Sequence, residues 1–180
     1  MKSDLEKWFE EEGEKILREI GIKKDDVILD FGCGKGIYSL PAAKIIGSKG
    51  KLFALDKSRT ELNKLANKAR SAGLNNIKII ETSGKLKIPM EDEFFDVVLL
   101  YDILHSYYFS SSERKELLEE TYRVLKYDGF LSVYPEHMSL EEIKKEIEEA
   151  GFFFDKKIPG KLIHEEKFTH THILNFKKTR

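Results

Sequence analysis

The sequence predicts an α/β fold built on a mostly parallel sheet. Apolar runs that indicate buried strands alternate with segments of helical periodicity along residues 27–134. Strands joined by helices need crossover connections, which make neighbouring strands parallel. The 180 residues suffice for one domain with its own core and are too few for two. We therefore expect a single domain spanning residues 1–180.

The first half of the chain is expected to alternate helices and strands. Ser3 and Glu6 have the spacing of a capping box, and apolar residues then recur at helical intervals up to Gly21. This N-terminal helix, residues 1–21, would pack on the core formed by residues 22–180 or close over a site as a lid. The elements expected next are a strand at 27–29, a helix near 39–46, a strand at 51–55, a helix near 58–72 and a strand at 77–80.

The second half continues this alternation and then departs from it. The expected elements are a strand at 95–100, a helix from a Ser110/Glu113 capping box to 126, a strand at 130–134, a helix from Ser139 to Gly151, and strands at 152–158 and 169–176. A loop, and no helix, joins the last two strands. Two strands joined in this way are antiparallel.

Composition excludes several classes of protein. The chain is 41% hydrophobic and 35% charged, which is typical of a globular protein and not of a disordered one. No apolar run approaches the roughly 20 residues that span a bilayer, and the acidic N-terminus is unlike a signal peptide. We expect a cytoplasmic protein without a membrane span. A net charge of −1 provides no general attraction to nucleic acid.

A glycine loop, Asp30-Phe31-Gly32-Cys33-Gly34-Lys35-Gly36, follows the first strand and precedes a helix. Glycines at such a turn let the backbone approach a ligand closely. Asp56 ends the next strand, where a βαβ unit places a carboxylate for ribose hydroxyls. These features indicate an adenosine-containing ligand. Dinucleotide loops have the spacing G-x-G-x-x-G, whereas the third glycine here comes one position early, which favours S-adenosylmethionine.

Four segments resemble the class I S-adenosylmethionine-dependent methyltransferases, most of all the ubiquinone/menaquinone-biosynthesis type and its small-molecule relatives. The segments are Val27–Gly36, Ile88–Val98, Tyr122–Leu131 and Ala150–Phe152, and the likeness extends over most of residues 27–177. The resemblance implies a Rossmann-like three-layer sandwich. Its seven-stranded, mostly parallel sheet would have the last strand antiparallel and inserted beside its predecessor.

The resemblance also implies where the cofactor lies. Lys57 would lie near the adenine, and Asp56 would hold the ribose. Relatives carry an aspartate for the adenine amino group after the third strand, where this chain has Thr82-Ser83-Gly84, so a Ser83 hydroxyl or a backbone group is expected to replace it. The residues expected around the methionine part are Asp30, Gly32, Cys33, Gly34 and Gly36. The lone Cys33 is expected to act as a small apolar residue, because no basic neighbour activates it.

Acceptor-side residues are expected after the fourth strand, because ligands of such sheets bind beyond the carboxyl ends of the strands. Asp102 and His105 are the titratable groups there. Asp102 is expected to contact cofactor or substrate. His105 would act as a catalytic base or, alternatively, pack and hydrogen-bond beneath the cofactor. Nearby aromatic residues would form an apolar pocket, a lid or plain core; they are Tyr107, Tyr108 and Phe109, with Trp8 and Phe9 from the N-terminal helix.

The histidines of the tail form the one metal-like cluster in the sequence, His164, His170 and His172 with Glu165 and Glu166. No third ligand follows at a defined spacing, so no metal is expected. We expect an enzyme, a monomer or homodimer, that transfers a methyl group to a small molecule and releases S-adenosylhomocysteine. The alternatives are a non-catalytic S-adenosylmethionine-binding module and a protein or RNA methyltransferase.

Overall fold

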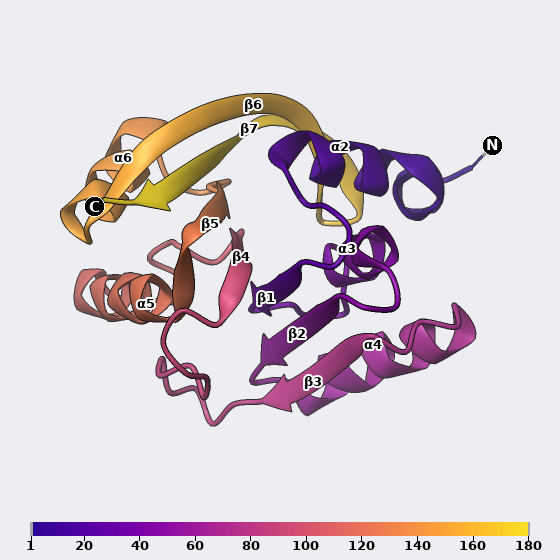
Figure 1. Cartoon of the computed structure of the whole chain (residues 1–180). Coiled ribbons are helices and arrows are strands. Elements are labelled where there is room, and N and C mark those ends of the chain that lie inside the picture. Colours follow the sequence, from indigo (N-terminus) through magenta and orange to yellow (C-terminus); the bar gives the residue numbers. More distant parts are fainter. Residues whose placement is uncertain (1, 180) are drawn as a thin grey trace.

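The computed structural model describes residues 2–179, so Met1 and Arg180 of the expected domain lie outside the described residues. One seven-stranded sheet runs through the molecule in the order β3-β2-β1-β4-β5-β7-β6 (Figure 1). Its strands are β1 (Val27–Phe31), β2 (Lys51–Asp56), β3 (Ile77–Glu81), β4 (Phe95–Tyr101), β5 (Leu125–Tyr134), β6 (Phe152–His164) and β7 (Lys167–Lys178). Every strand expected from the sequence is present.

Strand directions follow the prediction. β1 to β5 pair in parallel, and β7 lies antiparallel between β5 and β6. Parallel pairing places the ends of β1, β2 and β4 on one edge of the sheet, where the glycine loop and the expected site residues follow. The Rossmann-like architecture with the last strand inserted beside its predecessor is confirmed.

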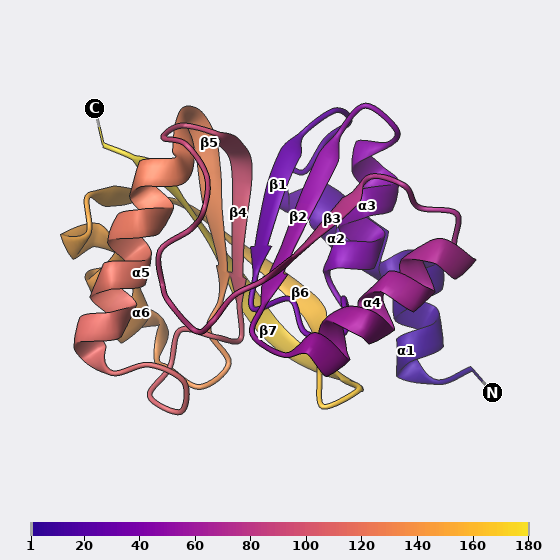
Figure 2. The same cartoon turned by 90° about the horizontal axis from the view of Figure 1, so that it is seen from below.

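Helices cover both faces of the sheet, which gives three layers (Figure 2). They are α1 (Asp4–Lys7), η1 (Trp8–Glu12), α2 (Gly13–Ile20), α3 (Ser39–Ile46), α4 (Arg59–Ser71), α5 (Ser111–Val124) and α6 (Leu140–Glu149). One buried cluster joins α2, α3 and α4 to the sheet, and a second joins α5 and α6 to the opposite face. Within residues 2–179 no helix has the length and apolar character needed to cross a bilayer.

The N-terminal helix is interrupted, contrary to the single helix expected. The Ser3/Glu6 capping box is present, but residues 8–12 form a π-helical turn between α1 and α2. Trp8 is fully buried there and donates its indole N–H to the Ile37 carbonyl at 2.8 Å. A Cβ on Gly13 would stand 2.9 Å from the Trp8 ring, so the turn accommodates the indole beside a residue without a side chain. This segment thus contributes to the core.

The tail hairpin is longer than predicted. Strand pairing continues to His164 and Lys167, so residues 159–163 lie in a strand where a loop was expected. Glu165 and Glu166 alone form the turn, with φ of 46° and 67°. Two-residue turns of this kind favour Asn and Gly. Because neither residue occurs at these two positions, the sequence did not predict the turn. An ion pair between Glu166 and Lys35 fastens the hairpin tip to the glycine loop.

Candidate functional site

The glycine loop turns sharply at the end of β1. Gly32, Gly34 and Gly36 have φ of 73°, 51° and 84°, which side chains rarely adopt. A Cβ at Gly36 would overlap the Leu65 side chain of α4, whereas a Cβ at Gly34 would meet nothing within 4 Å. Gly36 therefore serves close packing, and Gly34 faces open space.

Cys33 is buried within this loop. Burial, together with the negative charges of Asp30 and Asp56, raises the pKa of its thiol well above the ordinary value. A thiol that stays protonated is a poor nucleophile. The structure therefore agrees with the expected role of Cys33 as a small apolar residue.

Two carboxylates flank the glycine loop. Asp30 is buried at the end of β1 and accepts from the Ser39 hydroxyl at 2.5 Å. Asp56 ends β2 and accepts from the backbone N–H groups of Gly34 and Ser58, each at 2.8 Å, with one bond to each oxygen. Each oxygen of Asp56 keeps a free lone pair for a further donor.

Burial raises the pKa of Asp30 to about 6, with a further contribution from the negative charge of Asp56. Such a site disfavours an anionic ligand and favours a cationic one. A pyrophosphate between these two carboxylates would be repelled, whereas the ammonium and sulfonium of S-adenosylmethionine would be attracted. The residues present therefore fit that cofactor.

The residues expected near the adenine follow β2 and β3 on the same edge of the sheet. Lys57 is exposed directly after Asp56. Thr82 donates its backbone N–H to the Asp56 carbonyl at 3.0 Å, and this bond holds the start of the loop that carries Ser83 and Gly84. Adjacent strands thus bring together the ribose and adenine positions expected from the sequence.

Asp102 follows β4 in a left-handed conformation, with φ of 55°. Its backbone N–H donates to the Tyr134 carbonyl at 2.9 Å. One carboxylate oxygen, Oδ2, lies 3.0 Å from Nδ1 of His164. The other, Oδ1, is buried without a hydrogen-bond partner and lies 3.5 Å from His137 Nε2 and 3.9 Å from His105 Nε2. One carboxylate thus faces three imidazoles.

His105 lies beneath the surface with only 4% exposure. Burial lowers the pKa of its imidazole, and His137 and Arg114 lower it further against the opposing effect of Asp102. Its Nδ1 accepts the backbone N–H of Tyr107 at 3.2 Å, so in the neutral ring the proton sits on Nε2. Neither ring nitrogen then offers a free lone pair to a substrate. This arrangement favours the packing and hydrogen-bonding role over the catalytic one.

Folding supplies two site residues that the sequence did not indicate. His137 follows β5 and His164 is the last residue of β6, and both side chains lie within 3.5 Å of Asp102. The sequence grouped His164 with His170 and His172, but in the hairpin those two pair with Lys161 and Pro159. No sequence spacing links Asp102 to His137 or His164, because only the closing of the sheet brings them together.

Ligand atoms of Asp102, His105 and His137 lie within 4.8 Å of one another, a grouping that resembles a metal site. Metal ligation by His105 through Nε2 needs that nitrogen unprotonated. The Tyr107 N–H on Nδ1 holds the proton on Nε2 instead. The arrangement is better suited to holding a proton than a metal ion.

Aromatic residues around this cluster divide between core and surface. Tyr107 and Tyr108 are 82% and 58% exposed, and their rings contact His105. Trp8, in contrast, is buried against Tyr38, whose hydroxyl donates to the Ile163 carbonyl of the hairpin at 2.8 Å. Of the aromatic residues expected around the site, these two tyrosines are the most exposed.

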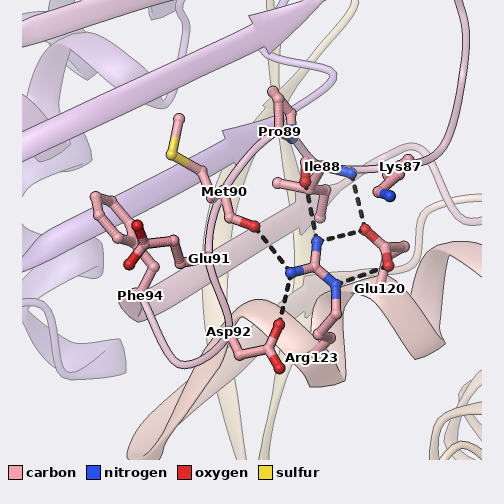
Figure 3. A pocket seen from close by; sticks show the side chains of 9 residues that line it. All are labelled: Lys87, Ile88, Pro89, Met90, Glu91, Asp92, Phe94, Glu120 and Arg123. Atoms are coloured by element: carbon pink, nitrogen blue, oxygen red, sulfur yellow. Dashed lines mark hydrogen bonds and ion pairs between the residues drawn. The ribbon is translucent and has the colours of Figure 1, made fainter.

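A separate hollow of about 670 Å³ lies beside the segment that enters β4 (Figure 3). Arg123 of α5 crosses it and donates to the Ile88 and Met90 carbonyls and to the carboxylates of Asp92 and Glu120. All five guanidinium N–H groups are thus occupied within the protein. Arg123 thereby links the segment that leads into β4 to the segment that leads into β5, and both segments resemble the methyltransferase family. We therefore assign this hollow a structural role.

The sheet order, the glycine loop and the two carboxylates together define a class I methyltransferase fold. A family model described as "Methyltransferase domain" matches residues 28–129, more than half of the chain, and the chain belongs to that family.

Relatives and solved structures agree with this assignment. The chain is 26% identical over 153 residues to a demethylmenaquinone methyltransferase of Staphylococcus aureus; the match covers 85% of the chain and 61% of that relative's length. A probable cobalt-precorrin-6B C(15)-methyltransferase of Saccharolobus solfataricus is 27% identical over 63% of the chain and 54% of the relative. A SAM-dependent methyltransferase structure from Aquifex aeolicus superposes with a TM-score of 0.79 at 25% identity, covering 96% of this chain and 93% of that one.

Proposed function

We propose that this chain binds S-adenosylmethionine and transfers its methyl group to a small molecule. The observation that carries the proposal is the pair of carboxylates around an open glycine loop. Asp30 lies where the ammonium of the methionine part would relieve the cost of its buried charge. Asp56 keeps lone pairs for the ribose hydroxyls. The cofactor supplies a methyl group already activated on a sulfonium.

The protein's own contribution is orientation and control of protons. Gly34 leaves room for the cofactor, Lys57 and Ser83 stand at the adenine end, and Asp102 stands at the acceptor end. Relatives are named as a demethylmenaquinone methyltransferase and a probable cobalt-precorrin-6B C(15)-methyltransferase, which supports a small-molecule acceptor. We extend the proposal to a cytoplasmic enzyme, a monomer or homodimer, that has no nucleic-acid partner.

Calorimetry with S-adenosylmethionine and S-adenosylhomocysteine tests cofactor binding. We expect binding to the wild-type chain, its loss in Asp56→Ala, and normal binding in Asp128→Asn, which changes an exposed carboxylate of β5. Absence of binding to the wild-type chain would refute the proposal.

Transfer of labelled methyl groups into a cell extract tests the enzymatic part. We expect label in the small-molecule fraction. Label in protein or RNA alone would support the alternative methyltransferase class, and binding without any transfer would support a non-catalytic module.

A further inference from the structure

We propose that His164 is the general base of the methyl transfer, oriented by Asp102, and that the acceptor therefore loses a proton from the atom that is methylated. The inference rests on the proposed function and deepens it. It assigns the catalytic proton transfer to a hairpin residue in place of His105, and it defines the acceptor chemically as one with an ionisable O–H or N–H group.

His164 and Asp102 have the geometry of a carboxylate–histidine pair. The Asp102 Oδ2 atom lies 3.0 Å from Nδ1 of His164. A carboxylate can only accept, so the proton of the neutral ring sits on Nδ1 and Nε2 carries a free lone pair. The His164 side chain is 21% exposed, so the ring is partly open to solvent. His105 holds the opposite tautomer and is almost wholly covered.

The hairpin tip places this base beside the cofactor loop. The Ile163 carbonyl, one residue before His164, accepts from Tyr38, which lies just after the glycine loop. Glu166, two residues after His164, pairs with Lys35 of the loop itself. On its other side His164 faces Asp102 at the end of β4. The base is therefore held between the glycine loop and the acceptor end of the sheet, where the methyl group is transferred.

The bonds and charges balance in this proton transfer. The acceptor O–H bond breaks and its proton passes to His164 Nε2, while the oxygen electron pair forms the bond to the methyl carbon. The electron pair of the carbon–sulfur bond stays on sulfur. The resulting imidazolium is stabilised by the Asp102 carboxylate, whose buried Oδ1 remains free for a second donor. His137 is a further titratable group against the ring, with centroids 5.1 Å apart.

Nitrogen-15 NMR of the histidine rings near pH 8 tests the assignment without any acceptor. We expect the Nδ1–H tautomer for His164 and the Nε2–H tautomer for His105, each assigned by its loss in the Gln variant. Asp102→Asn should remove the bias at His164, and His172→Gln on the same hairpin should change neither ring. A His164 ring with its proton on Nε2, or with no preference, would overturn the proposal.

Labelling of the small-molecule fraction of a cell extract then tests the catalytic role. His164→Gln should lower the rate by about 10² to 10⁴-fold near neutral pH, with S-adenosylmethionine affinity unchanged within about threefold. The deficit should shrink as pH rises, because the acceptor then ionises in solution. His172→Gln should label at the wild-type rate.

An equal rate in His164→Gln, a deficit that does not vary with pH, or loss of wild-type labelling on adding a metal chelator would each overturn the base assignment. Failure of the wild-type chain to bind S-adenosylmethionine would instead refute the proposed function. The tautomer measurement stands in either case, so the two failures are distinguishable.

Discussion

The buried carboxylate of Asp30 predicts an unusual pH dependence of stability. Its pKa in the folded chain is about 6, against 3.8 for an unperturbed aspartate, because burial disfavours the charged form. Between these two values the folded chain holds a proton that the unfolded chain has lost. The free energy of unfolding therefore falls as pH rises through this interval. Above pH 6 the charged Asp30 carboxylate lowers the stability of the folded chain by the full amount.

The size of the effect follows from the pKa difference. At 1.36 kcal/mol per pH unit, two pKa values about 2 units apart correspond to about 3 kcal/mol over the whole interval. Between pH 7.5 and pH 5.0, where only part of the titration occurs, this one group should stabilise the chain by about 1.4 kcal/mol. A transition midpoint would rise by roughly 3–6 °C in a protein of this size.

The variant Asp30→Asn isolates this contribution. An amide cannot ionise, and it still accepts from the Ser39 hydroxyl. Denaturant unfolding of both proteins at pH 5.0 and pH 7.5 gives a double difference in which the other titrating groups cancel. We expect Asp30→Asn to be the more stable protein at pH 7.5, to show a gain that is smaller by about 1.4 kcal/mol at pH 5.0, and to bind S-adenosylmethionine about 10 to 100-fold more weakly. Equal pH dependence in the two proteins would show that Asp30 is not held in a destabilised, charged state.

Three further predictions concern the loop, the hollow and the adenine end. Gly36→Ala should destabilise the chain by about 2–3 kcal/mol in denaturant unfolding, because its Cβ overlaps a leucine of α4 at positive φ. Gly34→Ala should lose less stability but should bind S-adenosylmethionine more weakly in calorimetry. A larger loss of stability in Gly34→Ala than in Gly36→Ala would contradict the geometry. Arg123→Met should lower the free energy of unfolding by about 2–3 kcal/mol. Lys115→Met, at an exposed site of the same helix, should change it by less than about 0.5 kcal/mol. Equal effects of the two substitutions would argue against a structural role for the hollow. Ser83→Ala should weaken S-adenosylmethionine binding by about threefold to tenfold, as expected for one lost hydrogen bond, and unchanged affinity would exclude its hydroxyl as the adenine contact.

The sequence predicted the elements of this fold because each carries a local signal. Three capping boxes, at Ser3, Ser110 and Ser139, mark helix starts that the structure contains. Continuous apolar runs marked the parallel strands. The π-helical turn at Trp8 had no such signal, because it depends on the contact of the indole with Ile37, a residue 29 positions away. A helix interruption that depends on tertiary contacts cannot be predicted from the spacing of apolar residues.

The candidate site divides in the same way. The grouping of the cofactor-side candidates at one edge of the sheet could be predicted, because these residues follow the first strands directly and spacing along the chain fixes their place in space. The position of Asp102 directly after β4 could be predicted for the same reason. Its partner His164 comes from 62 positions later, and its approach depends on a turn of two glutamates that resembles no favoured hairpin turn.

The length of the hairpin connects the fold to the chemistry. Had the strands ended at residues 158 and 169 as expected from the sequence, His164 would lie in a loop with no fixed direction. Pairing up to His164 and Lys167 makes the ring part of a strand instead, and the contacts of its neighbours with Tyr38 and Lys35 fix both sides of it. A general base must be held within hydrogen-bond reach of the proton it takes. In this protein an extended tail hairpin supplies that rigidity, whereas His105 after β4 accepts the Tyr107 N–H on Nδ1 and carries its proton on Nε2.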